Sequence, residues 1–157
     1  MHYLDLWRIK DDSYLQLSPA VLDIFGKYAQ VSCELPESGG ILLGYVRGNH
    51  LDIVEATEPT KNDKRERFFF LRRRSGHQNI ASRRWAESGG HVRYLGEWHT
   101  HPESIPQPSI LDLQEWESSA RRRADKRPQV GLIVGFDALH VELMDHAGSR
   151  TVCRPMY

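Results

Sequence analysis

The heptapeptide GEWHTHP at residues 96–102 restricts the fold more than any other part of the chain, because it places two histidines one residue apart before a proline. In an extended strand alternate side chains point to the same face, so His99 and His101 would lie side by side. We expect this strand to cover residues 95–101 and to end at Pro102, which has no backbone N–H to donate. The heptapeptide therefore predicts two imidazoles that converge at the end of a strand.

A helix should begin soon after this strand. Prolines keep residues 102–108 out of helical conformation, and Ser109 is suited to cap a helix whose first turn contains Asp112. Two neutral imidazoles and a carboxylate suit zinc, and three protein ligands leave a coordination position for water. The spacing from Ser109 to Asp112 is also that of a capping box, which needs no metal. The spacing alone leaves both interpretations open.

Together these residues resemble the JAMM motif of the JAB/MPN zinc metalloproteases, with His-Thr-His-Pro followed by Ser109 and Asp112. The resemblance covers about residues 37–136 and implies the cytidine-deaminase-like fold of that family. This fold is an α/β (α+β) sandwich with a mixed central sheet flanked by helices. The resemblance also implies a catalytic Zn²⁺ bound by His99, His101 and Asp112. It further implies that Ser109 hydrogen-bonds the oxyanion that develops during amide hydrolysis.

Glu37 is the candidate proton carrier. It precedes two glycines and a short apolar strand in the segment ESGGILLG at residues 37–44, and the glycines allow a close approach of backbones. From the residues alone Glu37 could be a solvated loop carboxylate, but the resemblance assigns this position to the catalytic glutamate of the family. Glu97 is a rival, because it shares the strand face of His99 and His101. Glu97 could be a partner of the metal ligands or a bystander, and we expect Glu37 to move the proton.

The remaining pattern predicts one domain over residues 1–157, with strands and helices around a mixed sheet. Further strands are expected in residues 4–10, 14–17, 45–54, 68–71, 130–136, 139–144 and 150–153. The segment 45–54 should be a hairpin with its tip at Gly48 and Asn49.

Three helices are expected. The first should begin at Pro19 after the cap Ser18, and the third should follow Ser109 and stop at Pro128. The second should cover residues 75–88 and end at two glycines. The side chains that should be buried in the second helix are Ile80, Ala81 and Trp85. Those that should be buried in the third are Leu113, Trp116, Ala120 and Ala124.

Charge and hydrophobicity indicate a cytoplasmic protein. The formal net charge is zero, which argues against bulk attraction to nucleic acid. No apolar run approaches the roughly 20 residues that span a bilayer, and the N-terminus lacks the basic and apolar regions of a secretion signal. The two cysteines, Cys33 and Cys153, form no Cys-x-x-Cys pair, so we expect buried thiols in a reducing compartment.

Basic residues gather in two stretches. They are Arg72, Arg73, Arg74, Arg83 and Arg84 in the first, and Arg121, Arg122, Arg123, Lys126 and Arg127 in the second. Such stretches can be solvated faces, and the second would also complement the dipole of the third helix. The functional alternative is a docking surface for an acidic partner. Nucleic acid is a weaker alternative, because no aromatic residues are interleaved with the arginines.

The resemblance implies a protein substrate with an extended C-terminal tail, cleaved after its last residue. The short chain and the GEWHTHP segment are most similar to bacterial JAMM isopeptidases of CBASS anti-phage operons, which remove a cGAS-like nucleotidyltransferase from its conjugates. An extended tail can be held by main-chain pairing with a strand edge. The strand of His99 should end at the metal, and residues 103–108 could border the same groove.

Three alternative functions of the protein are open from the sequence. The protein could process a ubiquitin-like or sulfur-carrier precursor, or it could be a scaffold of the MPN type without catalysis. A zinc nucleobase deaminase would suit the sandwich fold, but the Pro-Cys-x-x-Cys segment of those enzymes is absent.

Overall fold

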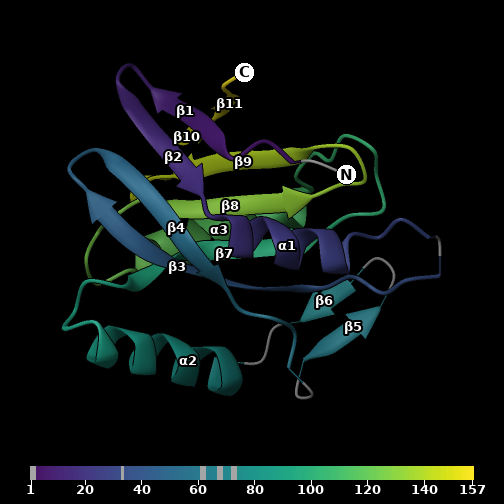
Figure 1. Ribbon diagram of the computed structural model, residues 1–157, viewed down its shortest axis with the longest axis horizontal. Helices are drawn as coiled ribbons and strands as arrows, with labels where there is room; N and C mark the ends of the chain where they lie inside the picture. Colours follow the sequence, from purple (N-terminus) through teal and green to yellow (C-terminus); the bar gives the residue numbers. More distant parts are fainter. Residues whose placement is uncertain (1–2, 33, 61–62, 67–68, 72–73) are drawn as a thin grey trace.

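The computed structural model describes residues 3–32, 34–60, 63–66, 69–71 and 74–157. Its helices are α1 (Pro19–Tyr28), α2 (Arg74–Glu87) and α3 (Ile110–Arg122). Its strands are β1 (Leu6–Lys10), β2 (Ser13–Leu17), β3 (Gly39–Arg47), β4 (His50–Ala56), β5 (Lys64–Glu66), β6 (Phe69–Leu71), β7 (Arg93–Thr100), β8 (Gln129–Val134), β9 (Leu139–Met144), β10 (Arg150–Val152) and β11 (Arg154–Pro155). The elements surround one mixed sheet (Figure 1), as the sequence predicted.

The large sheet closes on itself. Its order is β10-β9-β8-β7-β3-β4-β2-β1-β11, and its two terminal strands are consecutive in the chain, separated by Cys153 alone. The Cys153 amide donates to the carbonyl of Val141 at 2.9 Å, so the same short segment pairs with β9 on one side and β1 on the other. Burial raises the pKa of the Cys153 thiol to about 12, which agrees with the predicted buried thiol. Cys33 lies outside the described residues.

Helix α1 covers the inner face of this curved sheet (Figure 1). It begins where predicted, because the Ser18 hydroxyl oxygen accepts the N–H of Val21 and Pro19 occupies the first helical position. Phe25 is fully buried, and its ring centroid lies 5.3 Å from that of Trp98 on β7. The inner face of β7 is therefore covered by side chains of the hydrophobic core.

Helices α2 and α3 pack on the outer face, where alternation along β7 places His99. Helix α2 contacts β3 and β7 through Ile80 and Ala81, and α3 covers β8 and β9 through Trp116 and Ala120. The side chain of His99 consequently emerges on the stretch of sheet between the two helices, at the carboxyl end of β7.

Two helical predictions were wrong in part. Trp85 was expected to be buried, but it is 49% exposed, and its ring lies 5.7 Å from the guanidinium of Arg93. Helix α3 ends at Arg122, well before Pro128, so Ala124 is exposed beyond the helix. Helical periodicity was extrapolated past the residue where the chain turns toward β8.

A separate hairpin, β5 with β6, lies beside α2 (Figure 1). The apolar strand expected in residues 68–71 is present at Phe69–Leu71, and Phe68 lies outside the described residues. Its partner β5 was not predicted, because Lys64–Glu66 is charged and has no alternation of apolar residues. Within the described residues, no helix is long and apolar enough to cross a membrane.

Candidate metal centre

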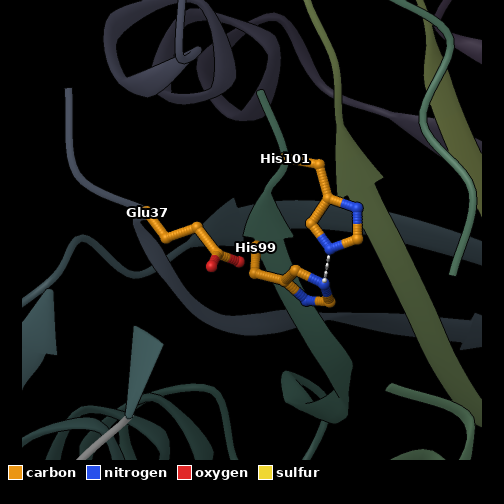
Figure 2. Close-up of side chains that lie close together, drawn as sticks. All are labelled: Glu37, His99 and His101. Atoms are coloured by element: carbon orange, nitrogen blue, oxygen red, sulfur yellow. Dashed lines mark hydrogen bonds between the residues drawn. The ribbon is translucent and has the colours of Figure 1, made fainter. Parts of the chain in front are cut away.

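The two histidines of the heptapeptide converge at the end of β7. His99 is the penultimate residue of the strand, and the His101 amide extends the pairing by donating to the Val134 carbonyl at 3.0 Å. The Nε2 atoms of the two rings lie 3.2 Å apart (Figure 2). Both side chains are largely buried, so their ring nitrogens face one another in a site with little solvent.

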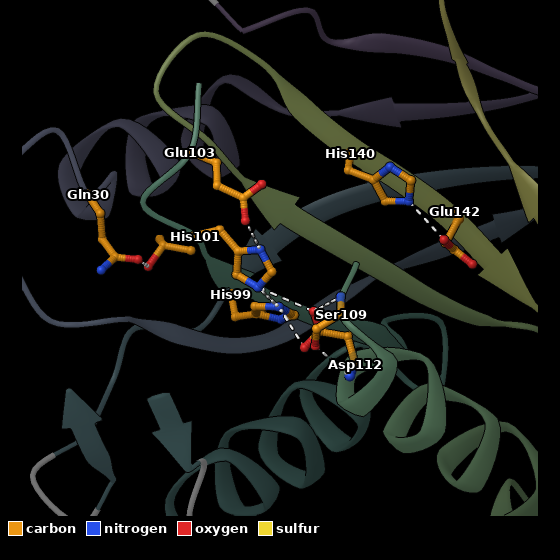
Figure 3. A network of polar contacts seen from close by, with 9 residues as sticks. Gln30, His99, His101, Glu103, Ser109, Asp112, His140 and Glu142 are labelled. Carbon is orange, nitrogen blue, oxygen red and sulfur yellow. Dashed lines mark hydrogen bonds and ion pairs between the residues drawn. The ribbon is translucent and has the colours of Figure 1, made fainter. Parts of the chain in front are cut away.

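Asp112 completes this cluster from the first turn of α3. Its Oδ1 lies 3.2 Å from His99 Nε2, and its Oδ2 lies 3.2 Å from His101 Nε2 (Figure 3). The same carboxylate accepts the Ser109 N–H at 2.8 Å, while the Ser109 hydroxyl oxygen accepts the Asp112 N–H at 3.1 Å. The capping box and the contact with both imidazoles, which the spacing left as alternatives, are present together.

A glycine sets how closely α3 approaches the sheet. A Cβ on Gly131 of β8 would lie 2.5 Å from the indole of Trp116, closer than real contacts allow. The absence of a side chain at Gly131 therefore lets Trp116 lie against β8. The ring of Trp116 is also 6.1 Å from that of His99. This packing brings the N-terminus of α3, and with it Asp112, down to the end of β7.

Glu37 reaches the cluster from the segment before β3 (Figure 2). A carboxylate oxygen of Glu37 and one nitrogen from each of His99 and His101 lie within 4.8 Å of one another, and Glu37 is only 6% exposed. Glu37 thus lies beside the two histidines, although it is 62 residues away from His99 in the sequence.

Thr100 fixes the Glu37 segment against β7. Its side chain points away from the histidines, and its hydroxyl oxygen accepts the Ser38 N–H at 2.9 Å. The Thr100 amide donates to the Ser38 carbonyl at 2.9 Å, and the Thr100 hydroxyl donates to Gln30 Oε1 at 3.0 Å. Gln30 and Thr100 were not predicted from the sequence as part of the site. They could have been found by asking which polar side chains the fold would bury beside a proposed ligand.

A second buried polar network supports the start of β3. A Cβ on Gly40 would lie 2.2 Å from the carbonyl oxygen of Thr57, so the expected close backbone approach occurs at this glycine. The Thr57 hydroxyl oxygen accepts the Ile41 N–H at 2.9 Å and lies 2.7 Å from His77 Nδ1. His77 Nε2 lies 2.8 Å from Asp63 Oδ2, and both side chains are fully buried. This network was also missed by the sequence analysis.

Burial and neighbouring charges shift the pKa values of the titratable groups at this site in different directions. Burial raises the pKa of Glu37 to about 7, against the opposing effect of His99 and His101. Burial alone would also raise the pKa of Asp112, but hydrogen bonds with His101 and His99 hold it far below its usual range. Burial would lower the pKa of His101, yet the hydrogen bond to Asp112 and the nearby carboxylates raise it. One carboxylate is therefore held ionised, and the other can exchange a proton near neutral pH.

The geometry fits a tetrahedral metal ion. With zinc–ligand bonds of about 2.0 to 2.1 Å, neighbouring ligand atoms of a tetrahedron lie about 3.3 Å apart. His99 Nε2 lies 3.2 Å from His101 Nε2 and from Asp112 Oδ1, and His101 Nε2 lies 3.2 Å from Asp112 Oδ2. When both imidazoles are neutral, their facing lone pairs and the Asp112 carboxylate could coordinate a cation between them. His99 and His101 could hold it together with Asp112 or with Glu37.

Glu97 has a different environment from Glu37. It is half-buried on the outer face and accepts a hydrogen bond from the Tyr94 hydroxyl at 3.3 Å. It does not belong to the group formed by Glu37, His99 and His101.

Several basic residues of the two stretches have structural partners. Arg123 donates to the carbonyls of Tyr94, Leu95 and Pro128 and to both oxygens of Asp125. Arg84 pairs with Glu55 and Glu87, and Arg121 pairs with Glu117.

A cavity of about 250 Å³ lies beside Arg123 and Arg127, and none of the metal-site residues lines it. Arg72 and Arg73 lie outside the described residues.

The strand that carries His99 has a neighbouring strand on each side. β7 is antiparallel to β3 on one side and parallel to β8 on the other. Both edges of β7 are therefore occupied, and no backbone groups remain for a further strand.

Comparison with known proteins agrees with this fold. The family model described as prokaryotic homologs of the JAB domain matches residues 20–146. A Pseudomonas aeruginosa protein named CD-NTase/cGAS isopeptidase is 44% identical over 157 residues, which cover 99% of each chain. Proteins of the same name are 36% identical in Escherichia coli, over 79% of this chain and 78% of theirs, and 40% identical in Vibrio cholerae, over 69% and 67%.

A solved structure shows the same fold at lower sequence similarity. The solution structure of protein DSY2949 from Desulfitobacterium hafniense has a TM-score of 0.58 and 17% identity, and the match covers 88% of each chain. The mixed sheet, the matched family model and the full-length relatives confirm the predicted fold class and resemblance. The chain belongs to the family of prokaryotic JAB-domain homologs, among relatives named as isopeptidases.

Proposed function

We propose that this protein is a zinc-dependent isopeptidase that hydrolyses the amide between the C-terminal residue of a protein tail and a lysine. The observation that carries the proposal is the cluster of His99, His101 and Asp112 atoms at 3.2 Å, with the buried Glu37 beside it. A metal-binding cluster and a protonatable carboxylate are the two parts that metal-assisted amide hydrolysis requires.

We assign His99, His101 and Asp112 as the zinc ligands and Glu37 as the proton carrier. Asp112 contacts both imidazoles at 3.2 Å and stays ionised, as a ligand must. Glu37 lies within 4.8 Å of the imidazole nitrogens, and its pKa of about 7 suits reversible protonation. Zinc, when bound, would supply the Lewis acidity that activates water and polarises the scissile carbonyl.

Two side chains then act on the substrate. Glu37 accepts a proton from the attacking water as the new carbon–oxygen bond forms, and it delivers this proton to the lysine amine as the carbon–nitrogen bond breaks. The Ser109 hydroxyl donates a hydrogen bond to the oxyanion of the carbonyl and keeps its proton. This proton is available, because the Ser109 oxygen already accepts the Asp112 N–H. The products are a free C-terminal carboxylate and a free lysine.

The proposed substrate is a cGAS-like nucleotidyltransferase joined through its C-terminus to other proteins. The name of the Pseudomonas aeruginosa relative, which matches this chain over 99% of both chains, supports this choice over a ubiquitin-like or sulfur-carrier precursor. Identity is 44% over 157 residues with the Pseudomonas aeruginosa relative, so the two chains share the domain and no large insertion separates them. We place this reaction in the cytoplasm, where such conjugates would be made.

The test uses the full chain and the C-terminal tail of a cGAS-like nucleotidyltransferase. The tail is linked through an amide to the lysine of a reporter protein, and a thioester of the same tail is a parallel substrate. We expect cleavage of the amide that a chelator abolishes, that zinc restores, and that Glu37→Gln lacks. Chelator-resistant amide cleavage, or hydrolysis of the thioester alone, would contradict the proposal.

A further inference from the structure

The proposed ligand set leaves His101 Nδ1 without a hydrogen-bond acceptor. An imidazole that binds a metal through Nε2 carries its proton on Nδ1, which then needs an acceptor. His101 Nε2 faces His99 and Asp112, so Nδ1 points to the other side of the ring. Nδ1 is buried, and the structure gives it no well-aligned hydrogen bond.

Glu103 is the acidic residue on that side. Its Oε1 lies 3.2 Å from His101 Nδ1 (Figure 3), within ion-pair distance although not aligned as a hydrogen bond. The Glu103 side chain is 47% exposed. Its carboxylate is thus partly in solvent and already close enough to Nδ1 to accept a hydrogen bond from it.

The backbone of Glu103 is held in place by the turn after β8. The Phe136 amide donates to the Glu103 carbonyl at 2.8 Å, and the Asp137 amide donates to the Ser104 carbonyl at 3.1 Å. A Cβ on Gly135 would lie 2.7 Å from the same Glu103 oxygen, so the two segments are in close contact. Because β8 pairs with β7, this turn keeps a fixed position relative to His101.

We propose that Glu103 is a positioning residue that accepts the Nδ1 proton of His101. It thereby fixes the tautomer and the orientation of the ring, so that Nε2 presents its lone pair to the metal. This inference rests on the proposed function, because it takes His101 to be a ligand. No contact of Glu103 with substrate is required.

The test measures zinc affinity by competition with a chelator, in the full-length protein and without substrate. Glu103→Ala should weaken zinc binding by roughly 10- to 100-fold, the usual effect of losing such a partner. Glu103→Gln keeps an acceptor oxygen, so its affinity should stay within about threefold of wild type. In nitrogen NMR spectra of the zinc-loaded wild type, the His101 Nδ1–H should be protected from exchange, and Glu103→Ala should remove this protection.

Two controls separate the carboxylate from other effects. Ser104→Ala removes the hydrogen bond from Ser104 to Asp137 and loosens the same loop, but it keeps the carboxylate. Glu34→Ala removes an exposed glutamate from another loop. Both controls should bind zinc as wild type does. The inference is overturned if Glu103→Ala binds zinc as tightly as Glu34→Ala, or if Ser104→Ala weakens binding as much as Glu103→Ala. Absence of zinc from the wild type would instead refute the proposed function.

Discussion

The hydroxyl oxygen of Thr100 accepts the backbone N–H of Ser38 at 2.9 Å, and the Thr100 amide donates to the Ser38 carbonyl at the same distance. This double connection joins the strand that carries both histidines to the segment that carries Glu37. Alternation along β7 sends the Thr100 side chain inward and the imidazoles outward. One strand end therefore presents the candidate metal ligands on one face and anchors the candidate proton carrier through the other.

Loss of the imidazoles should abolish zinc binding. We expect one zinc per chain in the wild type and none in the His99→Ala/His101→Ala double variant, measured by elemental analysis. Zinc affinity should fall as the pH drops, because protons compete for the imidazoles and Asp112 raises the pKa of His101. The decrease should thus begin above the ordinary histidine value of about 6.5. Equal zinc content in both proteins would contradict the ligand assignment.

Glu37 and Glu97 should differ in their effect on turnover. Glu37→Gln should keep its zinc but lose roughly 10²- to 10⁴-fold in kcat, because the proton carrier is removed and the ligands stay. Glu97→Gln should have the smaller effect, since Glu97 is absent from the ligand cluster. Steady-state kinetics on an amide-linked tail measures both. An inactive Glu97→Gln beside a fully active Glu37→Gln would reverse the two roles.

Glu37→Gln should also stabilise the zinc-free protein at alkaline pH. Burial raises the Glu37 pKa from 4.5 to about 7, so the folded state prefers the protonated carboxyl. Ionisation therefore destabilises the fold increasingly from pH 4.5 to 7, by up to about 3 kcal/mol above that range. Thermal unfolding in chelator should show Glu37→Gln above wild type at pH 8 and equal to it near pH 4. The same difference at both pH values would contradict this explanation.

Gly131→Ala should weaken both the fold and the metal site. The added Cβ would meet the Trp116 indole at 2.5 Å and push α3 away from β8. Overpacking of this kind costs about 1 to 3 kcal/mol, and the displaced helix should carry Asp112 away from the histidines. Chemical denaturation and zinc titration measure the two effects.

Gly26→Ala is the matched control for this variant. Gly26 lies in α1, and a Cβ there would have nothing within 4 Å. Alanine in a helix is favoured over glycine by about 0.5 to 1 kcal/mol, so this control should be slightly more stable than wild type. If both alanine variants bind zinc and unfold alike, the proposed role of the Gly131 contact is wrong.

His77→Leu should be strongly destabilising. His77 and Asp63 are both fully buried and lie 2.8 Å apart, so leucine would leave the Asp63 carboxylate buried without this partner. Removing one member of a buried pair typically costs about 3 to 5 kcal/mol. A loss of less than about 1 kcal/mol in denaturant unfolding would show that the pair contributes little.

Local patterns in the sequence were sufficient for the elements that carry the site. The strand with His99 and His101, the cap at Ser109 and the helix start at Pro19 follow from alternation, capping and proline geometry. These rules depend on neighbouring residues only, so they hold before the chain is packed. The same rules overextended α3 and misplaced Trp85, because where a helix ends and which face is covered depend on distant segments.

The sequence by itself predicted the candidate ligand types and their spacing, and through the family resemblance it predicted Glu37 as the candidate proton carrier. Tertiary structure alone decided that Asp112 caps α3 and contacts both imidazoles at once, and that Glu37 lies beside them. It also decided that Thr100, Gln30 and Glu103 surround the site, and that both edges of β7 are occupied. The physical reason is that these contacts join residues brought together by sheet pairing, whose partners no local periodicity specifies.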